Sequence, residues 1–350
     1  MTRRDALMMC GAAVGAALIP NRSMAATQRN ARFAELDWSD VEARLKGSID
    51  DKTFTGVGLL LCTAEGTFYK KAFGADTTET AHLLGSATKL ASTTAIMTLV
   101  DDKLIKLDDP VKKYLPQFGP VRGAITIRQL FAQTHGMPAN HPSIALPQRD
   151  NGITLEESVN RIARDDSVLY PAGSKHEYQP AVSYHIGGRI AEIVTGEVWN
   201  KLFDKRVRIP LDMKTFTYGE TRNPRIGGGA KCALQDYGNL LQMHLAGGVF
   251  KGRRALSETS VREMQKDQLG GVPFTPVART NGYGLSWWWE AMADGSRGVQ
   301  MSVPGVYGAI PWINTRIGYG GFQLVGKRLP DSFRLFYSIY PIINERLGKK

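Results

Sequence analysis

The sequence predicts a mixed α/β (α+β) fold, in which one antiparallel sheet is built from both ends of the chain and flanked by helices, with a large helical lobe in between. Three observations predict this. The N-terminal part contains a β-rich hairpin pattern, the C-terminal part contains several aromatic or β-branched runs of strand length, and the long middle is helical with Pro/Gly-rich loops. A cleft between the two lobes is the expected place for a site.

The first elements are a surface helix and a hairpin. Residues 36–47 place apolar side chains at near-helical spacing, and residues 55–62 and 67–73 are β-rich runs separated by a short turn. Residues 86–100 contain neither Gly nor Pro and predict a helix. Further helices are expected at 127–131, 155–163, 186–194 and 234–246, strands at 283–290, 306–313 and 320–325, and a final amphipathic helix at 333–347.

The first 25 residues have the pattern of a signal peptide. Arg3 and Arg4 form a positive head, and the apolar run that follows them is too short for a membrane span, which needs about 20 residues. Ser23 and Ala25 supply the small residues of a cleavage site, so we expect cleavage after Ala25. The arginine pair indicates the twin-arginine route. The protein is therefore expected to be exported, to the periplasm or the medium.

The rest of the chain, residues 26–350, is expected to form one domain. Its sheet lobe would comprise about 26–85 and 281–350, and its helical lobe about 86–280. No other run is apolar enough to span a membrane once the leader is removed. The oligomeric state is not predicted by any of these patterns.

Composition narrows the classes of function. The net charge of +11 comes from 44 Lys and Arg against 33 Asp and Glu, but the basic residues are spread along the chain without interleaved aromatics, which argues against nucleic-acid binding. Three cysteines are too few for a disulfide framework or a cysteine-built zinc site. The six histidines show no ligand spacing, so neither a metal nor a cofactor is expected.

Ser86 and Lys89 are the first candidates for catalysis. The chain lacks the phosphate-loop, dinucleotide, nucleophile-elbow and zincin motifs, whereas residues 86–89 read SATK at the predicted start of a helix. Residues three apart share one helix face, so the lysine amine can reach the serine hydroxyl. Such a lysine becomes a base when burial and a neighbouring positive charge lower its pKa toward neutrality. Taken alone this spacing is weak, since an exposed helix pair gives the same pattern.

Further motifs in a fixed order supply the context. The residues that carry them are LGSATK at 84–89, LDDPVKKYLP at 107–116, ITIRQL at 125–130, THGMP at 134–138, PAGSKHEY at 171–178, GGGAKCALQDY at 227–237 and LAGG at 245–248. The chain thereby resembles the serine β-lactamase-related, penicillin-binding-protein-like hydrolases, which include class C β-lactamases, D-alanyl-D-alanine carboxypeptidases and family VIII esterases. The resemblance implies a β-lactamase/transpeptidase-like fold and makes Ser86 the nucleophile and Lys89 its base.

The family's second motif, Tyr-x-Asn, falls on residues 178–180, which read YQP. The resemblance makes Tyr178 the residue that relays protons to the leaving group, while Pro180 replaces the motif's asparagine and cannot supply its amide. A rival alignment would select Tyr184 instead. The alternative for either tyrosine is a place in the core.

The third motif is matched best by residues 303–308, VPGVYG. The resemblance implies that Gly305 lets the substrate approach a strand beside the nucleophile, and that the amides of Ser86 and Val306 form an oxyanion hole. Val303 removes the cation that would bind a substrate carboxylate. This favours a neutral ester or amide, unless an arginine or lysine from elsewhere replaces that cation.

The sequence thus predicts an exported serine hydrolase that acts through an acyl-enzyme on carboxylic esters or related small acyl compounds. The alternative within enzymes is a D-Ala-D-Ala carboxypeptidase or β-lactamase. The alternative from another class is a catalytically degenerate binding protein of the same fold, because Val303 and Pro180 depart from two of the three motifs.

Overall fold

The computed structural model describes residues 21–138 and 142–349 of the chain. The predicted signal peptide lies mostly outside these residues, and positions 21–25 form the beginning of helix α1 (Asn21–Ala34). From Arg29 onward this helix is attached to the rest of the fold, since Arg29 pairs with Glu65 and the Asn30 side chain donates to the Gly66 carbonyl.

Within the described residues, seven strands form one antiparallel sheet in the order β2-β1-β11-β10-β9-β8-β7. The pairing of β1 with β11 joins the two ends of the chain, which confirms the predicted sheet. The strands are β1 (Gly56–Thr63), β2 (Gly66–Gly74), β7 (Thr280–Tyr283), β8 (Trp288–Glu290), β9 (Gln300–Ser302), β10 (Ile310–Asn314) and β11 (Tyr319–Leu324).

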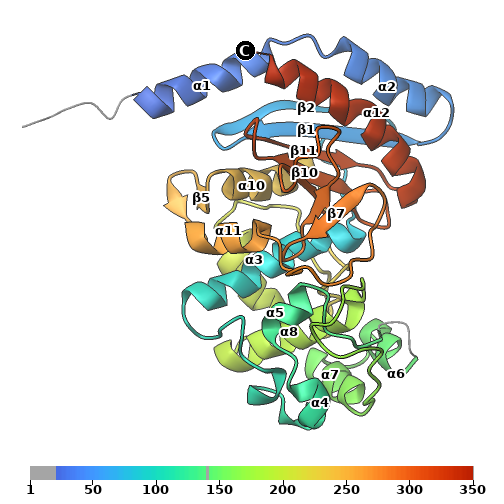
Figure 1. Ribbon diagram of the computed structural model, residues 1–350. Helices are drawn as coiled ribbons and strands as arrows, with labels where there is room; N and C mark the ends of the chain where they lie inside the picture. Colours follow the sequence, from blue (N-terminus) through green and yellow to red (C-terminus); the bar gives the residue numbers. More distant parts are fainter. Residues whose placement is uncertain (1–20, 139–141, 350) are drawn as a thin grey trace, which may run out of the picture.

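Helices cover both faces of this sheet (Figure 1). Helices α2 (Ser39–Asp50) and α12 (Leu329–Gly348) lie on one face, and α10 (Leu234–Leu245) and α3 (Thr88–Asp101) lie on the other. Strand β1 shows the consequence: Leu59 and Leu61 belong to the hydrophobic cluster beneath α12, whereas Leu60 and Cys62 belong to the cluster around α3 and α10. A strand buried on both faces is apolar throughout rather than alternating, as this one is.

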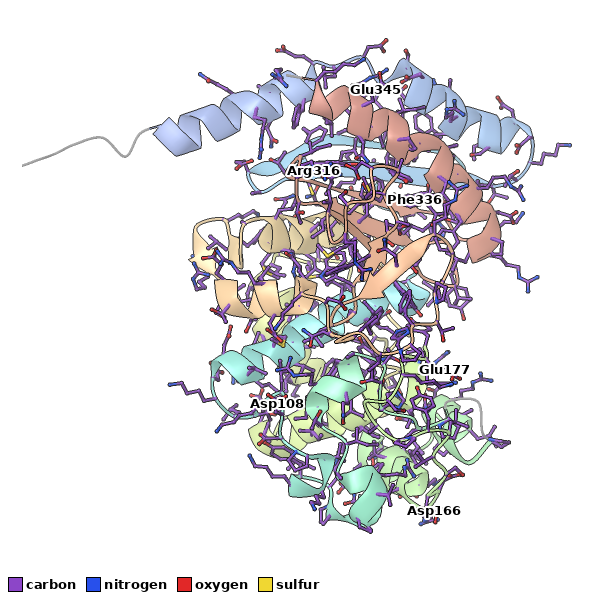
Figure 2. The ribbon with its side chains drawn as sticks, viewed as in Figure 1. Asp108, Asp166, Glu177, Arg316, Phe336 and Glu345 are labelled. Carbon is purple, nitrogen blue, oxygen red and sulfur yellow. The ribbon has the colours of Figure 1, made fainter. Side chains whose placement is uncertain are left out.

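The helical part of the chain lies beyond α3 and α10, at the bottom of Figure 1. It contains α4 (Gly119–Gly123), α5 (Ile127–Phe131), α6 (Pro142–Ala145), α7 (Leu155–Ala163), α8 (Pro180–Thr195) and α9 (Trp199–Phe203), while α11 (Glu258–Gln265) lies nearer the sheet. Local sequence sets these boundaries. Thr154 caps α7 by accepting from the Glu157 amide, and α8 ends at Gly196 with φ 69°. In Figure 2, Asp108, Asp166 and Glu177 lie on this part, and Arg316, Phe336 and Glu345 lie on the sheet part.

The smaller elements connect these parts. Two-residue ladders pair β3 (His82–Leu83) with β4 (Lys231–Cys232) and β5 (Val249–Phe250) with β6 (Arg253–Arg254). Single helical turns occur at η1 (Gly85–Ala87), η2 (Val111–Lys113), η3 (Pro116–Phe118), η4 (Pro147–Arg149) and η5 (Asp204–Arg208). The β3–β4 ladder brings the chain just before Ser86 beside the segment that follows the glycines at 227–229.

Two of the predicted strands have wrong boundaries. The run predicted as one strand at 283–290 forms β7 and β8 with a tight turn between them, in which the Gly284 amide donates to the Trp287 carbonyl 2.7 Å away. Ser286 has φ 80° in this turn, and its Oγ atom is held by Tyr184 and Thr93. The strand predicted at 306–313 begins only at Ile310, because residues 305–308 form the turn of the β9–β10 hairpin.

No helix within residues 21–138 and 142–349 combines the length and apolarity that a membrane crossing requires. In the same ranges there is no group of three or more His, Cys, Asp or Glu that could hold a metal ion. Cys62 and Cys232 are free and buried, and burial raises the pKa of both thiols above their ordinary value. A thiol in such an apolar environment is chemically inert.

Candidate active site

Ser86 and Lys89 lie together at the junction of η1 and α3. The Nζ atom of Lys89 lies 2.8 Å from the Oγ atom of Ser86 and also donates to the carbonyl of Gly227. Ser86 is half-buried, while Lys89 is only 2% exposed. The three-residue spacing therefore places the lysine amine behind the serine hydroxyl and away from bulk water, as the sequence predicts.

Burial determines the charge state of this lysine. Loss of hydration, together with the positive charge of Arg225, lowers the pKa of Lys89 to about 7. Among the described residues Lys89 has no acidic partner that would offset this effect. A lysine in this state is a neutral amine in a large fraction of the molecules at neutral pH, and in that form it can accept a proton from Ser86.

Tyr178 completes the group. Its hydroxyl is near enough to interact with the Ser86 side chain, and the centre of its ring lies 5.4 Å from Lys89 Nζ. Burial raises the pKa of Tyr178 well above its ordinary value, so its hydroxyl remains protonated at neutral pH. The tyrosine can therefore give a proton to an oxygen or nitrogen that leaves, but it is a poor base.

Aromatic residues of the sheet hold the Tyr178 ring. The ring centre of Trp288 lies 5.1 Å from that of Tyr178, and the ring of Tyr283 lies 6.5 Å away. The sequence leaves the tryptophans at 287–289 undecided between the core and the cleft. In the structure Trp287 is fully buried, whereas Trp288 packs directly against Tyr178.

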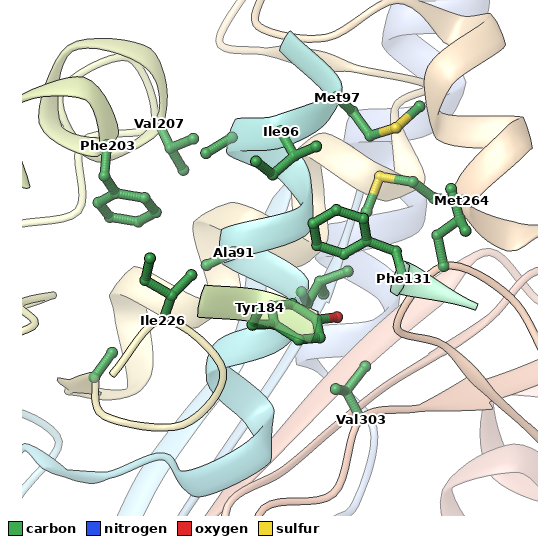
Figure 3. Packing of buried hydrophobic residues seen from close by; sticks show 14 of the residues in the cluster. Ala91, Ile96, Met97, Phe131, Tyr184, Phe203, Val207, Ile226, Met264 and Val303 are labelled. Atoms are coloured by element: carbon green, nitrogen blue, oxygen red, sulfur yellow. The ribbon is translucent and has the colours of Figure 1, made fainter. Parts of the chain in front are cut away.

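Tyr184, the rival for the second motif, lies in a different environment. Its hydroxyl is hydrogen-bonded to Thr93 Oγ1 at 3.1 Å and to Ser286 Oγ at 2.7 Å, inside the main hydrophobic cluster. Figure 3 shows this ring among buried side chains beside α3. Its ring lies as close to Lys89 Nζ as that of Tyr178, at 5.4 Å, but of these two hydroxyls only that of Tyr178 interacts with the Ser86 side chain.

The turn of the β9–β10 hairpin lies directly against the nucleophile. A Cβ atom on Gly305 would lie 1.8 Å from the Leu84 carbonyl oxygen, and one on Gly85, where φ is 54°, would lie 2.7 Å from the Val306 nitrogen. Both positions therefore require glycine for this approach. Val306 lies in the turn and not on a strand as the sequence predicts, and among the described residues its amide has no acceptor.

The two residues that depart from the family motifs, Pro180 and Val303, both fit their structural environment. Pro180 is the first residue of α8, where the missing amide hydrogen costs nothing. Val303 is apolar, 1% exposed and part of the same cluster as Tyr184 (Figure 3), so it offers neither a charge nor an accessible side chain to a ligand.

The sequence by itself assigns no role to the loop that carries Arg225 and Gly227. Its three consecutive glycines, which let backbone approach a site closely, are the signal that could have indicated one.

Comparison with known proteins agrees with this fold. The chain is 27% identical over 179 residues to protein flp of Staphylococcus aureus (strain MW2), an alignment that covers 47% of this chain and 35% of that protein. It therefore spans about a third of that relative's length. It is 23% identical over 303 residues to 6-aminohexanoate-dimer hydrolase of Paenarthrobacter ureafaciens, covering 79% of this chain and 72% of the relative.

Solved structures share the architecture. A presumed β-lactamase from Bacteroides dorei DSM 17855 matches with a TM-score of 0.75 and 28% identity, over 87% of this chain and 98% of that one. A family VIII carboxylesterase matches with a TM-score of 0.70 and 16% identity, over 87% and 97% of the two chains, and shows the fold alone. The model of the family described as Beta-lactamase matches residues 41–335, and the chain belongs to this family of serine-hydrolase fold.

Proposed function

We propose that the protein is a serine hydrolase that forms an acyl-enzyme on Ser86. The observation that carries this proposal is the meeting of Ser86, a buried Lys89 whose pKa is about 7, and a protonated Tyr178. A serine hydroxyl is a poor nucleophile unless a base removes its proton, and here the base lies within hydrogen-bond distance.

The reaction has two steps. In the first, Ser86 Oγ attacks the substrate carbonyl carbon, Lys89 takes the serine proton, and the bond to the leaving group breaks while Tyr178 gives a proton to it. Lys89 then returns a proton to the tyrosine oxygen. In the second, a water molecule attacks the acyl-enzyme, its proton passes to the lysine, and the acid leaves as Ser86 regains its proton. The amides of Ser86 and Val306 stabilise the oxyanion in both steps.

A neutral carboxylic ester or related acyl compound is the proposed substrate. Val303 is buried and uncharged, and the neighbouring Val306, which lies against Gly85 beside the nucleophile, has an apolar side chain that is 57% exposed. An exposed apolar side chain at this place favours uncharged acyl or alcohol groups through burial of their surface. No metal or cofactor takes part in the proposed steps, and the partner is a small molecule.

We also propose export through the twin-arginine route, on the evidence of Arg3, Arg4 and the apolar run that follows them. Cleavage after Ala25 would keep the described contacts of α1, which begin at Arg29. Mass spectrometry of the mature protein after expression in a bacterial host tests this, and a first residue other than Ala26 would contradict the cleavage site.

The test of the hydrolase compares the wild-type protein with Ser86→Ala. The wild type should hydrolyse p-nitrophenyl esters from a panel of different chain lengths. After incubation with a fluorophosphonate, its intact mass should increase by the mass of one covalently bound probe group. Both signals should be lost in Ser86→Ala, whose fold is checked by its melting temperature. Equal hydrolysis by the two proteins would overturn the proposal, and absence of any adduct on the wild type would favour a binding protein of the same fold.

Arg225 favours a second candidate, a D-Ala-D-Ala carboxypeptidase or β-lactamase. This arginine is exposed, lies near enough to Lys89 to lower the lysine's pKa, and has no ion-pair partner among the described residues. It could bind the carboxylate that such substrates carry. Nitrocefin hydrolysis or labelling by a fluorescent penicillin, reduced at least tenfold in Arg225→Gln, would favour this candidate over the neutral ester.

A further inference from the structure

The segment that carries Tyr178 is held on both sides by one neighbouring turn, formed by residues 133–137. This turn follows α5 and contains Gln133, which has φ 58° although it is not glycine. A non-glycine residue in this left-handed region is strained and persists only where surrounding contacts hold it. The contacts of Gln133 and His135 with the tyrosine segment are such contacts.

Gln133 holds the peptide groups on either side of Tyr178. Its backbone carbonyl accepts from the Glu177 amide at 3.1 Å, and its side-chain Oε1 accepts from the Gln179 amide at 3.1 Å. The Nε2 group of the same side chain donates to the Leu130 carbonyl and to Ser183 Oγ, both at 3.1 Å. The side chain is fully buried and uses both ends of its amide, so its orientation is fixed.

His135 holds the next carbonyl. Its Nδ1 atom accepts from the Met137 amide at 3.0 Å, so the hydrogen of the neutral ring is on Nε2, which donates to the Gln179 carbonyl at 3.2 Å. This ring is also fully buried. Its buried surroundings keep it neutral, because loss of hydration lowers the pKa of His135 to about 4. The tautomer required for donation is thus maintained at neutral pH.

The position after Gln179 cannot contribute an amide, because residue 180 is proline. On the C-terminal side of Tyr178, both peptide groups of Gln179 are engaged by this turn: its amide donates to Gln133 and its carbonyl accepts from His135. Resting on the proposed function, we propose that Gln133 and His135 are positioning residues that hold the Tyr178 hydroxyl at Ser86 by fixing the backbone on both sides of this tyrosine.

The experiment uses paired variants of the full chain. Gln133→Met keeps the volume and removes the three hydrogen bonds of the side-chain amide, including the one from the Gln179 amide. His135→Leu removes the donor to the Gln179 carbonyl, and His135→Gln can retain it. Gln323→Met is the matched control: Gln323 is another fully buried glutamine, with its Nε2 bonded to Ser332, but it lies on β11 away from Tyr178. All four are compared by melting temperature, so that loss of folding is recognised.

The first readout does not depend on activity. Hydrogen–deuterium exchange at residue resolution should show that the Gln179 amide exchanges at least tenfold faster in Gln133→Met, while Gln323→Met leaves its rate unchanged. Unchanged protection of this amide in Gln133→Met would overturn the proposal. Because this readout needs no substrate, it decides the structural part even if the wild type fails to hydrolyse esters and the proposed function is wrong.

The second readout is the coupling with Tyr178. Displacement of a reacting group by about 1 Å can cost on the order of 100-fold in rate, so Gln133→Met and His135→Leu should lower kcat about 10-fold to 100-fold with little change in KM. His135→Gln should recover most of this loss. In a Tyr178→Phe background the same substitutions should change kcat less than twofold. Equal losses in the two backgrounds would show that they act elsewhere, and would overturn the positioning role.

Discussion

Within residues 21–138 and 142–349, the amine of Lys89 is hydrogen-bonded to two oxygens, the hydroxyl of Ser86 at 2.8 Å and the carbonyl of Gly227, and to no carboxylate. This relationship distinguishes a base from an ordinary ion-paired lysine. A carboxylate at the same distance would hold the lysine charged, whereas a hydroxyl and a carbonyl in a buried place leave its pKa near neutrality.

The activity should follow the charge of Lys89. If the neutral amine acts as the base, as proposed, kcat/KM should fall about tenfold per pH unit below an apparent pKa of about 7 and level off above it. Removing the neighbouring positive charge in Arg225→Gln should move this limb to higher pH, since a charge that lowers the lysine pKa is lost. Lys89→Arg, which cannot lose its proton, should be inactive. A profile without an acid limb, measured with an ester whose spontaneous hydrolysis is subtracted, would contradict Lys89 as the base.

The close approach of the hairpin turn should depend on Gly305. In Gly305→Ala, the new methyl would meet the Leu84 carbonyl and force the turn, with the Val306 amide, away from Ser86. Loss of one oxyanion donor costs about 10²-fold to 10³-fold in kcat. Gly47→Ala is the control, because nothing lies within 4 Å of its Cβ position. Activity of Gly305→Ala within threefold of the wild type would contradict an oxyanion hole in this turn.

Two tyrosines should respond differently to the loss of a hydroxyl. Tyr178→Phe should lower kcat by about 10²-fold to 10⁴-fold, the usual contribution of a general acid or base, with little change in melting temperature. Tyr184→Phe removes the hydrogen bonds to Thr93 and Ser286 and should lower the free energy of unfolding by about 1–3 kcal/mol while kcat changes little. The reverse result would assign the second motif to Tyr184.

Glu290 should make stability depend on pH. Burial raises the pKa of its carboxyl to about 7 from 4.5, despite hydrogen bonds from Ser302 and Tyr337 and the nearby charge of Arg279. Between these two values the folded state holds a proton that the unfolded state has lost, so the free energy of unfolding should fall as pH rises from 4.5 to about 7. The full effect is about 3 kcal/mol on the scale of 1.36 kcal/mol per pKa unit.

The measurement is chemical denaturation at several pH values for the wild type and Glu290→Gln. The glutamine variant lacks this titration. As pH rises from 4.5 to about 7, its free energy of unfolding should therefore increase relative to that of the wild type. A difference that stays constant from pH 4.5 to 8 would show that Glu290 does not titrate as expected.

The sequence by itself determined most of the main elements and the fact that strands from both ends of the chain share one sheet, but not the order of those strands. The apolar run of β1 and the β-rich segments after residue 280 are local patterns in the sequence. Pairing them in one buried sheet removes their apolar side chains from water. The spacing of Ser86 and Lys89 is likewise local, since three residues on one helix turn determine their separation. The resemblance in the ordered motifs then assigned Tyr178, Gly305 and Val306 to the site.

Only the tertiary structure decided the rest. The pKa of Lys89 depends on burial and on Arg225, 136 positions later in the chain, and no local pattern reports either. The different environments of the two rival tyrosines are also set by tertiary contacts, since the Tyr178 hydroxyl interacts with Ser86 and the Tyr184 hydroxyl is hydrogen-bonded to Thr93. The turn at 305–308 also looked like a strand because its residues are β-prone, but its approach to Leu84 is a contact between distant segments. Long-range packing sets such contacts, and it overrides local propensity.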